Sequence, residues 1–94
     1  EPFTDIFRFS EDQPKCSVEL RLTLKAYNTL IEEYPRSIAD VKPEGNNHYY
    51  LKTKVASYIG IGRFVMSMLE DVEIIRPASF KNHIRKRMEN HLKR

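Results

Sequence analysis

The sequence contains no tryptophan, a single cysteine and only three glycines among its 94 residues. It has no run of about 18 apolar residues, the length that a membrane-spanning helix needs, and no signal-peptide pattern at its start. With one cysteine, Cys16, the chain cannot form an internal disulfide, and a reducing compartment is expected. A chain this short also excludes a barrel enzyme, a doubly wound dinucleotide fold and a cleft between two domains.

The composition indicates one small globular domain, because 40% of the residues are hydrophobic and 31% are charged. The charge is unevenly placed. Residues 80–94 carry six basic and one acidic side chain, a net charge of +5, whereas residues 1–79 carry ten basic and twelve acidic ones, a net charge of −2. Basic blocks attract nucleic acid or acidic partners, but cations in the last turns of a helix also favour its dipole, which is the preferred interpretation.

The first fifteen residues form an arm with too many apolar side chains for a free linker. Phe3, Ile6, Phe7 and Phe9 are interspersed with prolines and a polar stretch at residues 10–13. We therefore expect the arm to dock, either on this domain or on a neighbouring one. The chain begins with glutamate rather than methionine, which suggests a processed product or a piece of a longer protein.

Hydrophobic periodicity predicts the secondary structure. Strict alternation places Val18, Leu20, Leu22 and Leu24 on one face of a first strand. The predicted strands are residues 17–24, 37–42, 48–55 and 72–76, with a turn at 43–47 that makes the second and third a hairpin. The predicted helices are residues 27–34, ended by Pro35, residues 58–69, and a final helix capped by Ser79 with the apolar stripe Phe80, Ile84, Met88 and Leu92.

This order of elements predicts an α+β fold, the ferredoxin-like βαββαβ sandwich with an additional C-terminal helix. Right-handed crossovers give the strand order 4-1-3-2 across the sheet. Two helices then cover one face of the sheet, and no predicted element covers the other face.

No catalytic constellation is visible. His48, His83 and His91 lack the spacing of metal ligands, Cys16 has no obvious base beside it, and neither a metal nor a cofactor is expected. An enzyme is therefore the least favoured class, because no convergent set of polar residues appears.

The first candidate site is the stretch around Gly60, Gly62 and Arg63. Two glycines at the start of a helix can expose backbone N–H groups to an anion, and the arginine adds a permanent charge with five donors. The stretch lacks the full spacing of a phosphate loop. The preferred interpretation is that the glycines let the helix start close to the sheet, while Arg63 pairs with an acid.

The second candidate site is the uncovered face of the sheet. The two central strands display Arg21, Tyr50, Lys52 and Lys54 there, and an aromatic ring among cations suits single-stranded nucleic acid. Glu19 on the same face argues against this use. A face that is solvated, or packed on another domain or a second copy, is the preferred interpretation.

Several short apolar motifs resemble one protein family. Residues 58–77 combine a helix, the acidic-hydrophobic strand Val-Glu-Ile-Ile at 72–75 and a proline at 77, and a final basic helix follows. The strand at 18–22, Val-Glu-Leu-Arg-Leu, and the segment at 3–9 complete the pattern. Over residues 2–92 the chain resembles the C-terminal extension (WCX) domain of WYL-domain transcriptional regulators.

The resemblance implies a regulatory domain without catalytic activity, in a bacterial cytoplasmic regulator. In such regulators an N-terminal winged helix-turn-helix reads DNA, and a central WYL domain binds an effector such as single-stranded nucleic acid or another ligand. Neither a helix-turn-helix nor the Trp-Tyr-Leu signature occurs in these residues. DNA reading would therefore lie in a missing N-terminal domain.

On this interpretation residues 1–15 leave a missing upstream WYL-like domain, and residues 16–94 are the ferredoxin-like C-terminal regulatory domain. The domain would sense a ligand by pairing subunits in a homodimer and by completing an effector pocket for a nucleic-acid or other anionic effector. Its further partners would be the upstream WYL domain and DNA, which the missing N-terminal domain would contact. No membrane partner is expected. The alternative is a free-standing module that binds single-stranded nucleic acid on the open sheet face.

Overall fold

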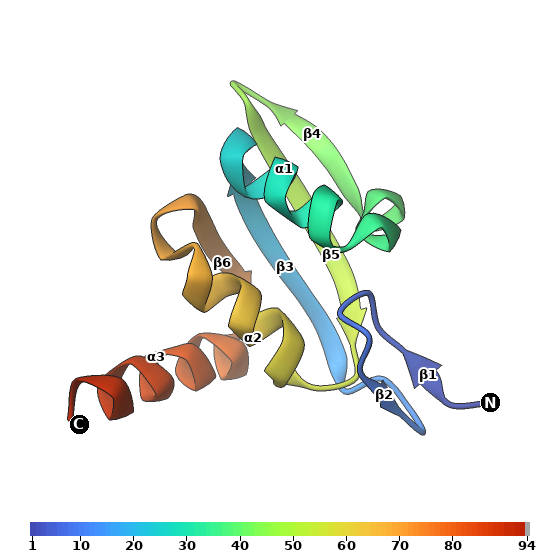
Figure 1. Cartoon of the computed structure of the whole chain (residues 1–94), viewed down its shortest axis with the longest axis vertical. Coiled ribbons are helices and arrows are strands. Elements are labelled where there is room, and N and C mark those ends of the chain that lie inside the picture. The colour runs from blue at the N-terminus through green and yellow to red at the C-terminus, as the bar shows by residue number, and fades with distance from the viewer. Residues whose placement is uncertain (94) are drawn as a thin grey trace.

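The computed structural model describes residues 1–93, so Arg94, one of the basic residues of the tail, lies outside it. Its main feature is a four-stranded antiparallel sheet in the order β4-β5-β3-β6 (Figure 1). The strands of this sheet are β3 Cys16–Thr23, β4 Val41–Gly45, β5 His48–Val55 and β6 Val72–Arg76. The helices are α1 Leu24–Glu33, α2 Tyr58–Ser67 and α3 Ala78–Leu92, with short 3₁₀ helices η1 Pro35–Asp40 and η2 Leu69–Asp71.

This arrangement confirms the predicted ferredoxin-like fold with its additional C-terminal helix. β3, the first strand of the motif, lies between the third strand, β5, and the fourth, β6, which is the 4-1-3-2 order. α1 and α2 lie on one face of the sheet (Figure 1). Val18, Leu20 and Leu22 of β3 point to that face and are fully buried, as the alternation predicted.

The boundaries between strands and helices differ from the prediction by a few residues. Thr23 ends β3 and caps α1, because its Oγ1 accepts a hydrogen bond from the Ala26 N–H at 3.2 Å. The placement of Leu24 on the buried face of the strand was therefore wrong, since Leu24 begins α1 and is 41% exposed. α2 ends at Ser67, and Leu69 lies in η2 instead of the helix.

The predicted strand at residues 37–42 is wrong over most of its length. Residues Pro35–Asp40 form η1, and the strand runs over Val41–Gly45. Pro35 suits the first turn of a helix, and the Ser37 N–H donates to the Tyr34 carbonyl at 2.9 Å, which closes that turn. The predicted turn is confirmed at its end, where Gly45, Asn46 and Asn47 all adopt positive φ before β5.

The predicted cap of the last helix is also wrong. Pro77 is the N-cap of α3, and its side chain makes no capping hydrogen bond. Ser79 lies inside the helix, where its Oγ is 2.7 Å from the hydroxyl of Tyr58 on α2. The serine therefore joins two helices, because Tyr58 offers its hydroxyl a partner within reach.

The N-terminal arm docks on this domain, one of the two possibilities that its apolar residues left open. It contains a two-stranded hairpin of β1 Phe3–Thr4 and β2 Ser10–Glu11. Ile6 and Phe7, between these strands, are buried in the common core. The Phe7 ring lies edge-on to the ring of Tyr34 at 4.8 Å between centroids.

Candidate functional site

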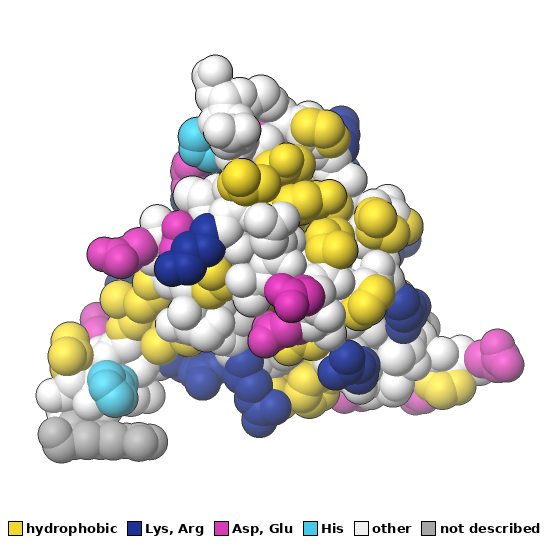
Figure 2. Space-filling view, turned by 45° about the horizontal axis from the view of Figure 1, so that its top comes forward, with side chains coloured by type: hydrophobic (Ala, Val, Ile, Leu, Met, Phe, Trp, Pro, Cys, Tyr) yellow, Lys and Arg dark blue, Asp and Glu magenta, His cyan; other side chains and the backbone are white. Residues whose placement is uncertain are grey.

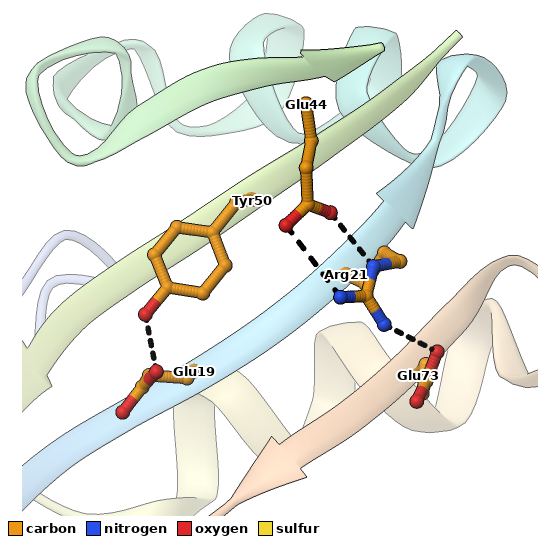
Figure 3. Close-up of polar contacts among 5 residues, drawn as sticks. All are labelled: Glu19, Arg21, Glu44, Tyr50 and Glu73. Atoms are coloured by element: carbon orange, nitrogen blue, oxygen red, sulfur yellow. Dashed lines mark hydrogen bonds and ion pairs between the residues drawn. The ribbon is translucent and has the colours of Figure 1, made fainter. Parts of the chain in front are cut away.

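The uncovered face of the sheet carries a network of ion pairs centred on Arg21 of β3 (Figure 3). Its Nε donates to Oε1 of Glu44 on β4 at 2.7 Å, and its Nη1 donates to Oε1 of Glu73 on β6 at 3.0 Å. These hydrogen bonds raise the pKa of Arg21, and the bond from Arg21 lowers the pKa of Glu44. The guanidinium that was predicted to face an anion is thus engaged by two carboxylates.

Tyr50 of β5 belongs to the same network. Its hydroxyl donates to Oε1 of Glu19, which raises the pKa of Tyr50 (Figure 3). The other oxygen of Glu19 lies 3.4 Å from Nε of Arg76 on β6. The ammonium of Lys42 lies 5.6 Å from the centroid of the Tyr50 ring, within cation–π range. The only aromatic ring predicted for this face is therefore partnered at its hydroxyl and beside a cation.

Lys52 and Lys54 lie on the same face of β5 and are exposed. Neither forms an ion pair with any residue in 1–93. The structure thus brings Arg21 and Tyr50 into one charge-balanced network and leaves the two lysines outside it. Binding of single-stranded nucleic acid needs free cations beside free rings, so this network weighs against that use, which stays a prediction.

The predicted anion site at Gly60, Gly62 and Arg63 lies in the first two turns of α2. Gly60 lies under the arm, where a Cβ would be 2.5 Å from Cβ of Phe7. Gly62 faces α3, where a Cβ would be 3.2 Å from Nη1 of Arg87. Both glycines thus allow a neighbouring element to approach α2 closely.

Arg63 is exposed, and its guanidinium lies 5.9 Å from the centroid of the Phe9 ring. It forms no ion pair with an acid among residues 1–93, contrary to the preferred interpretation of this stretch. The arm therefore provides the neighbour of this arginine, through a cation–π contact. Anion binding at Arg63 and the two glycines stays a prediction.

Side chains from β3, α2 and α3 meet around the ring of Tyr58. Its hydroxyl is 3.2 Å from Sγ of Cys16 and 2.7 Å from Oγ of Ser79, and the ammonium of Lys15 lies 4.9 Å from the ring centroid. Burial, followed by the contact with Cys16, raises the pKa of Tyr58. The ring of His83 lies 5.4 Å away, and its buried Nε2 has no hydrogen-bond partner among residues 1–93.

His83 is expected to make the domain less stable as the pH falls below about 6.5. Burial above all, and then the charges of Arg87 and Lys15, lower the pKa of His83 below its ordinary value of 6.5. Between the lowered folded-state pKa and 6.5 the unfolded chain binds a proton that the folded chain does not. The free energy of unfolding therefore decreases as the pH falls through this window. Above the window, the stabilising contribution of the neutral His83 is complete.

Urea unfolding between about pH 8 and about pH 5 measures this effect. A His83→Gln variant should lose part of the decrease. The control is His91→Gln, because His91 is exposed on the same helix. Equal decreases in the two variants would contradict the assignment to His83.

A hollow of about 360 Å³ lies at the outer edge of β5, and no pattern in the sequence indicates it. The arm contributes residues 3–6 to its lining, η1 contributes Arg36 and Asp40, and β5 contributes residues 52–54. Alternation along the strand assigns Lys52 and Lys54 to the sheet face alone, and no pattern in the sequence singles out Arg36.

The model of the WCX domain family matches residues 14–92. No curated protein and no solved structure matches the chain significantly. Within residues 1–93, no helix combines the length and the apolar character needed to cross a membrane.

Proposed function

Since the chain belongs to the WCX domain family, we propose that it is the effector-response and subunit-pairing domain of a bacterial WYL-type transcriptional regulator. The family is associated with WYL regulators and is not a known catalytic family. In the proposed regulator, residues 1–15 lead from an upstream WYL-like domain, and a helix-turn-helix in front of that domain reads DNA in the cytoplasm.

The observation that carries this proposal is the apolar stripe of α3, which continues beyond the body of the domain. Phe80 and Ile84 are buried, whereas Met88 is 39% and Leu92 is 81% exposed at the next two positions of the same stripe. Figure 2 shows hydrophobic side chains on this projecting end of the molecule, at the lower left. An exposed continuation of a buried stripe is typical of a surface that another subunit covers.

Charge indicates how two copies would meet. Residues 80–94 carry +5 and residues 1–79 carry −2, so two α3 helices side by side would repel each other. We therefore expect the end of α3 to lie against the body of the partner subunit.

α2 connects the arm to this pairing surface. The arm contacts α2 at Gly60, through Phe7 and Phe9, and α3 contacts α2 at Gly62, through His83 and Arg87. When the upstream domain changes its arrangement and shifts the arm, the arm would thus displace α2, which packs against α3. Effector occupancy that favours one of two arrangements would then bias subunit pairing.

Replacing Met88 and Leu92 together with glutamate is expected to convert a dimer of the 94-residue chain into a monomer. Burying two carboxylates in an apolar contact costs several kcal/mol, more than a small interface supplies. Sedimentation velocity across a concentration series measures the change.

The matched control is Asn82→Glu with Asn90→Glu, which adds the same charge to the same helix. Both asparagines are exposed on α3 and lie on the side away from the stripe, so this variant should remain dimeric. A wild-type chain that stays monomeric at every concentration, or a dimer that survives both substitutions in the stripe, would rule out pairing through this helix.

A further inference from the structure

The outer edge of β5 is open along its second half. β4 pairs with β5 only as far as Val41 and Leu51, because the preceding residues turn away as η1. On the inner side, Thr53 and Lys54 remain paired with β3. This open edge lies between η1 and the arm, at the right of Figure 1.

The hollow of about 360 Å³ occupies this edge, and two hydrogen bonds hold its walls in place. The Asp5 Oδ2 accepts from the Ala56 N–H at 2.9 Å, which ties the arm to the end of β5. The Thr53 hydroxyl donates to Oδ2 of Asp40 at 2.7 Å, which ties η1 to the middle of the strand. The volume is that of a site for a small molecule, about 300–1,000 Å³, and its walls are formed before any ligand arrives.

The carboxylates of this hollow are already engaged. Asp5 is 1% exposed and accepts from three backbone N–H groups, those of Phe7, Phe9 and Ala56. Asp40 accepts from the Thr53 hydroxyl. Neither acid forms an ion pair with a cation within residues 1–93.

The cations of the hollow are Arg36, Lys52 and Lys54, and all three are exposed. They form no ion pair in the described part of the chain, and Arg36 makes one long bond, from Nη1 to the Asp5 carbonyl at 3.5 Å. A guanidinium offers a planar fork that matches phosphate or carboxylate, and two ammonium groups beside it add charge. Phe3 and Ile6 supply the apolar part of the lining.

We propose that this edge hollow binds a small organic anion. Its phosphate or carboxylate group contacts Arg36, Lys52 and Lys54, and its apolar part lies against Phe3 and Ile6. Anion binding by the hollow gives the proposed effector its chemical class. Only the role of the anion as an effector rests on the proposed function. Since the arm forms one wall, an occupied hollow fixes the arm against β5. The arm is also the segment that connects this domain to the upstream domain in the proposed regulator.

Titration of the ¹⁵N-labelled 94-residue chain tests the site, with inorganic phosphate, citrate and adenosine monophosphate as probes. We expect saturable shifts of the backbone amides of Thr53, Lys54 and residues 4–6. Adenosine monophosphate should bind more tightly than inorganic phosphate, because its ring adds apolar contact. Stronger binding of citrate would assign the hollow to carboxylates, and stronger binding of adenosine monophosphate to phosphates.

The decisive comparison uses two double variants of equal charge. Lys52→Gln with Lys54→Gln should weaken binding of the preferred probe at least about tenfold, the effect of one lost charge-assisted hydrogen bond. The control is Lys81→Gln with Lys86→Gln, two exposed lysines of α3, which should leave the affinity unchanged. Equal weakening in the two variants would overturn the site, because it would show general attraction of anions to a basic protein.

Four further outcomes are decisive. Absence of saturable shifts with all three probes at about 10 mM, the weakest affinity of interest, would overturn the inference. A single-stranded oligonucleotide that binds more than about a hundredfold more tightly than adenosine monophosphate would assign the surface to nucleic acid instead. A chain that dimerises through α3 but binds no anion would count against this site alone. A chain that binds an anion but stays monomeric would count against the pairing function alone.

Discussion

Replacing Asp5 with alanine is expected to lower the free energy of unfolding by about 3 kcal/mol and to release the N-terminal arm. The carboxylate accepts from the N–H groups of Phe7 at 2.9 Å, Phe9 at 3.1 Å and Ala56 at 2.9 Å. Without it, three donors lose their acceptor, and those of Phe7 and Ala56 are buried. Each unsatisfied buried donor costs about 1–3 kcal/mol.

The arm limits this loss, because it can open and let water reach the donors. Opening exposes Ile6 and Phe7, whose burial contributes about 1.5–3 kcal/mol each. The smaller of the two costs determines the result, and the lower end of each range is about 3 kcal/mol. Urea unfolding measures the free energy, and the amide spectrum of residues 3–11 reports the arm.

Asp12→Ala is the matched control for this variant. Asp12 belongs to the same arm and is exposed, so its removal should change the stability by less than about 0.5 kcal/mol. An Asp5→Ala variant as stable as Asp12→Ala, with an unchanged arm, would show that the carboxylate does not hold the arm in place.

The fold could be predicted because its core follows two simple periods. β3 and β5 alternate strictly, and their buried residues, such as Leu20 and Leu51, point to the helices as the alternation requires. With these strands fixed, the handedness of the crossovers leaves one strand order. Both depend on local patterns that a single sequence displays.

The region around residues 35–42 could not be predicted because local and tertiary preferences compete there. Ile38, which suggested a strand, is 63% exposed, whereas the polar Ser37 is fully buried under the sheet edge. No hydrophobic period exists in such a segment. Since η1 positions Arg36 and Asp40, the same failure concealed one wall of the edge hollow.

The electrostatics of the open face depend on partners far apart in the sequence. Arg21 pairs with residues 23 and 52 positions away, so its neutralisation follows from strand order and register. The sequence placed Arg21, Lys52 and Lys54 on one face correctly but could not distinguish the paired cation from the unpaired ones. Because Arg21 is paired whereas Lys52 and Lys54 are not, we expect anion contacts at the edge of the sheet instead of at its centre.

The two glycines of α2 look equivalent in the sequence, yet alanine is expected to lower the free energy of unfolding at Gly60 only. Gly60→Ala should lower the free energy of unfolding by about 1–3 kcal/mol, since its Cβ would lie 2.5 Å from Cβ of Phe7 and 2.9 Å from Cδ2 of Phe9. Cβ of Phe7 is fixed to the backbone of the arm and cannot rotate away. The gain in helix propensity, at most about 1 kcal/mol, does not offset this overlap.

Gly62→Ala should leave the stability unchanged or raise it by up to about 1 kcal/mol. Its Cβ would meet Nη1 of Arg87 at 3.2 Å and Nε2 of His83 at 3.4 Å. The nearest of these atoms is the far end of a flexible side chain, which can move by a few tenths of an ångström. The propensity gain therefore remains.

Urea unfolding of the two single variants decides between close approach and anion binding as the role of these glycines. Close approach predicts a loss of stability and displaced arm amides in Gly60→Ala only. Backbone N–H groups that bind an anion tolerate alanine at both positions, since the substitution leaves every N–H in place. If the two variants are equally stable and the arm is undisturbed in both, Gly60 has no packing role. Anion binding would then be the favoured role of this turn of α2.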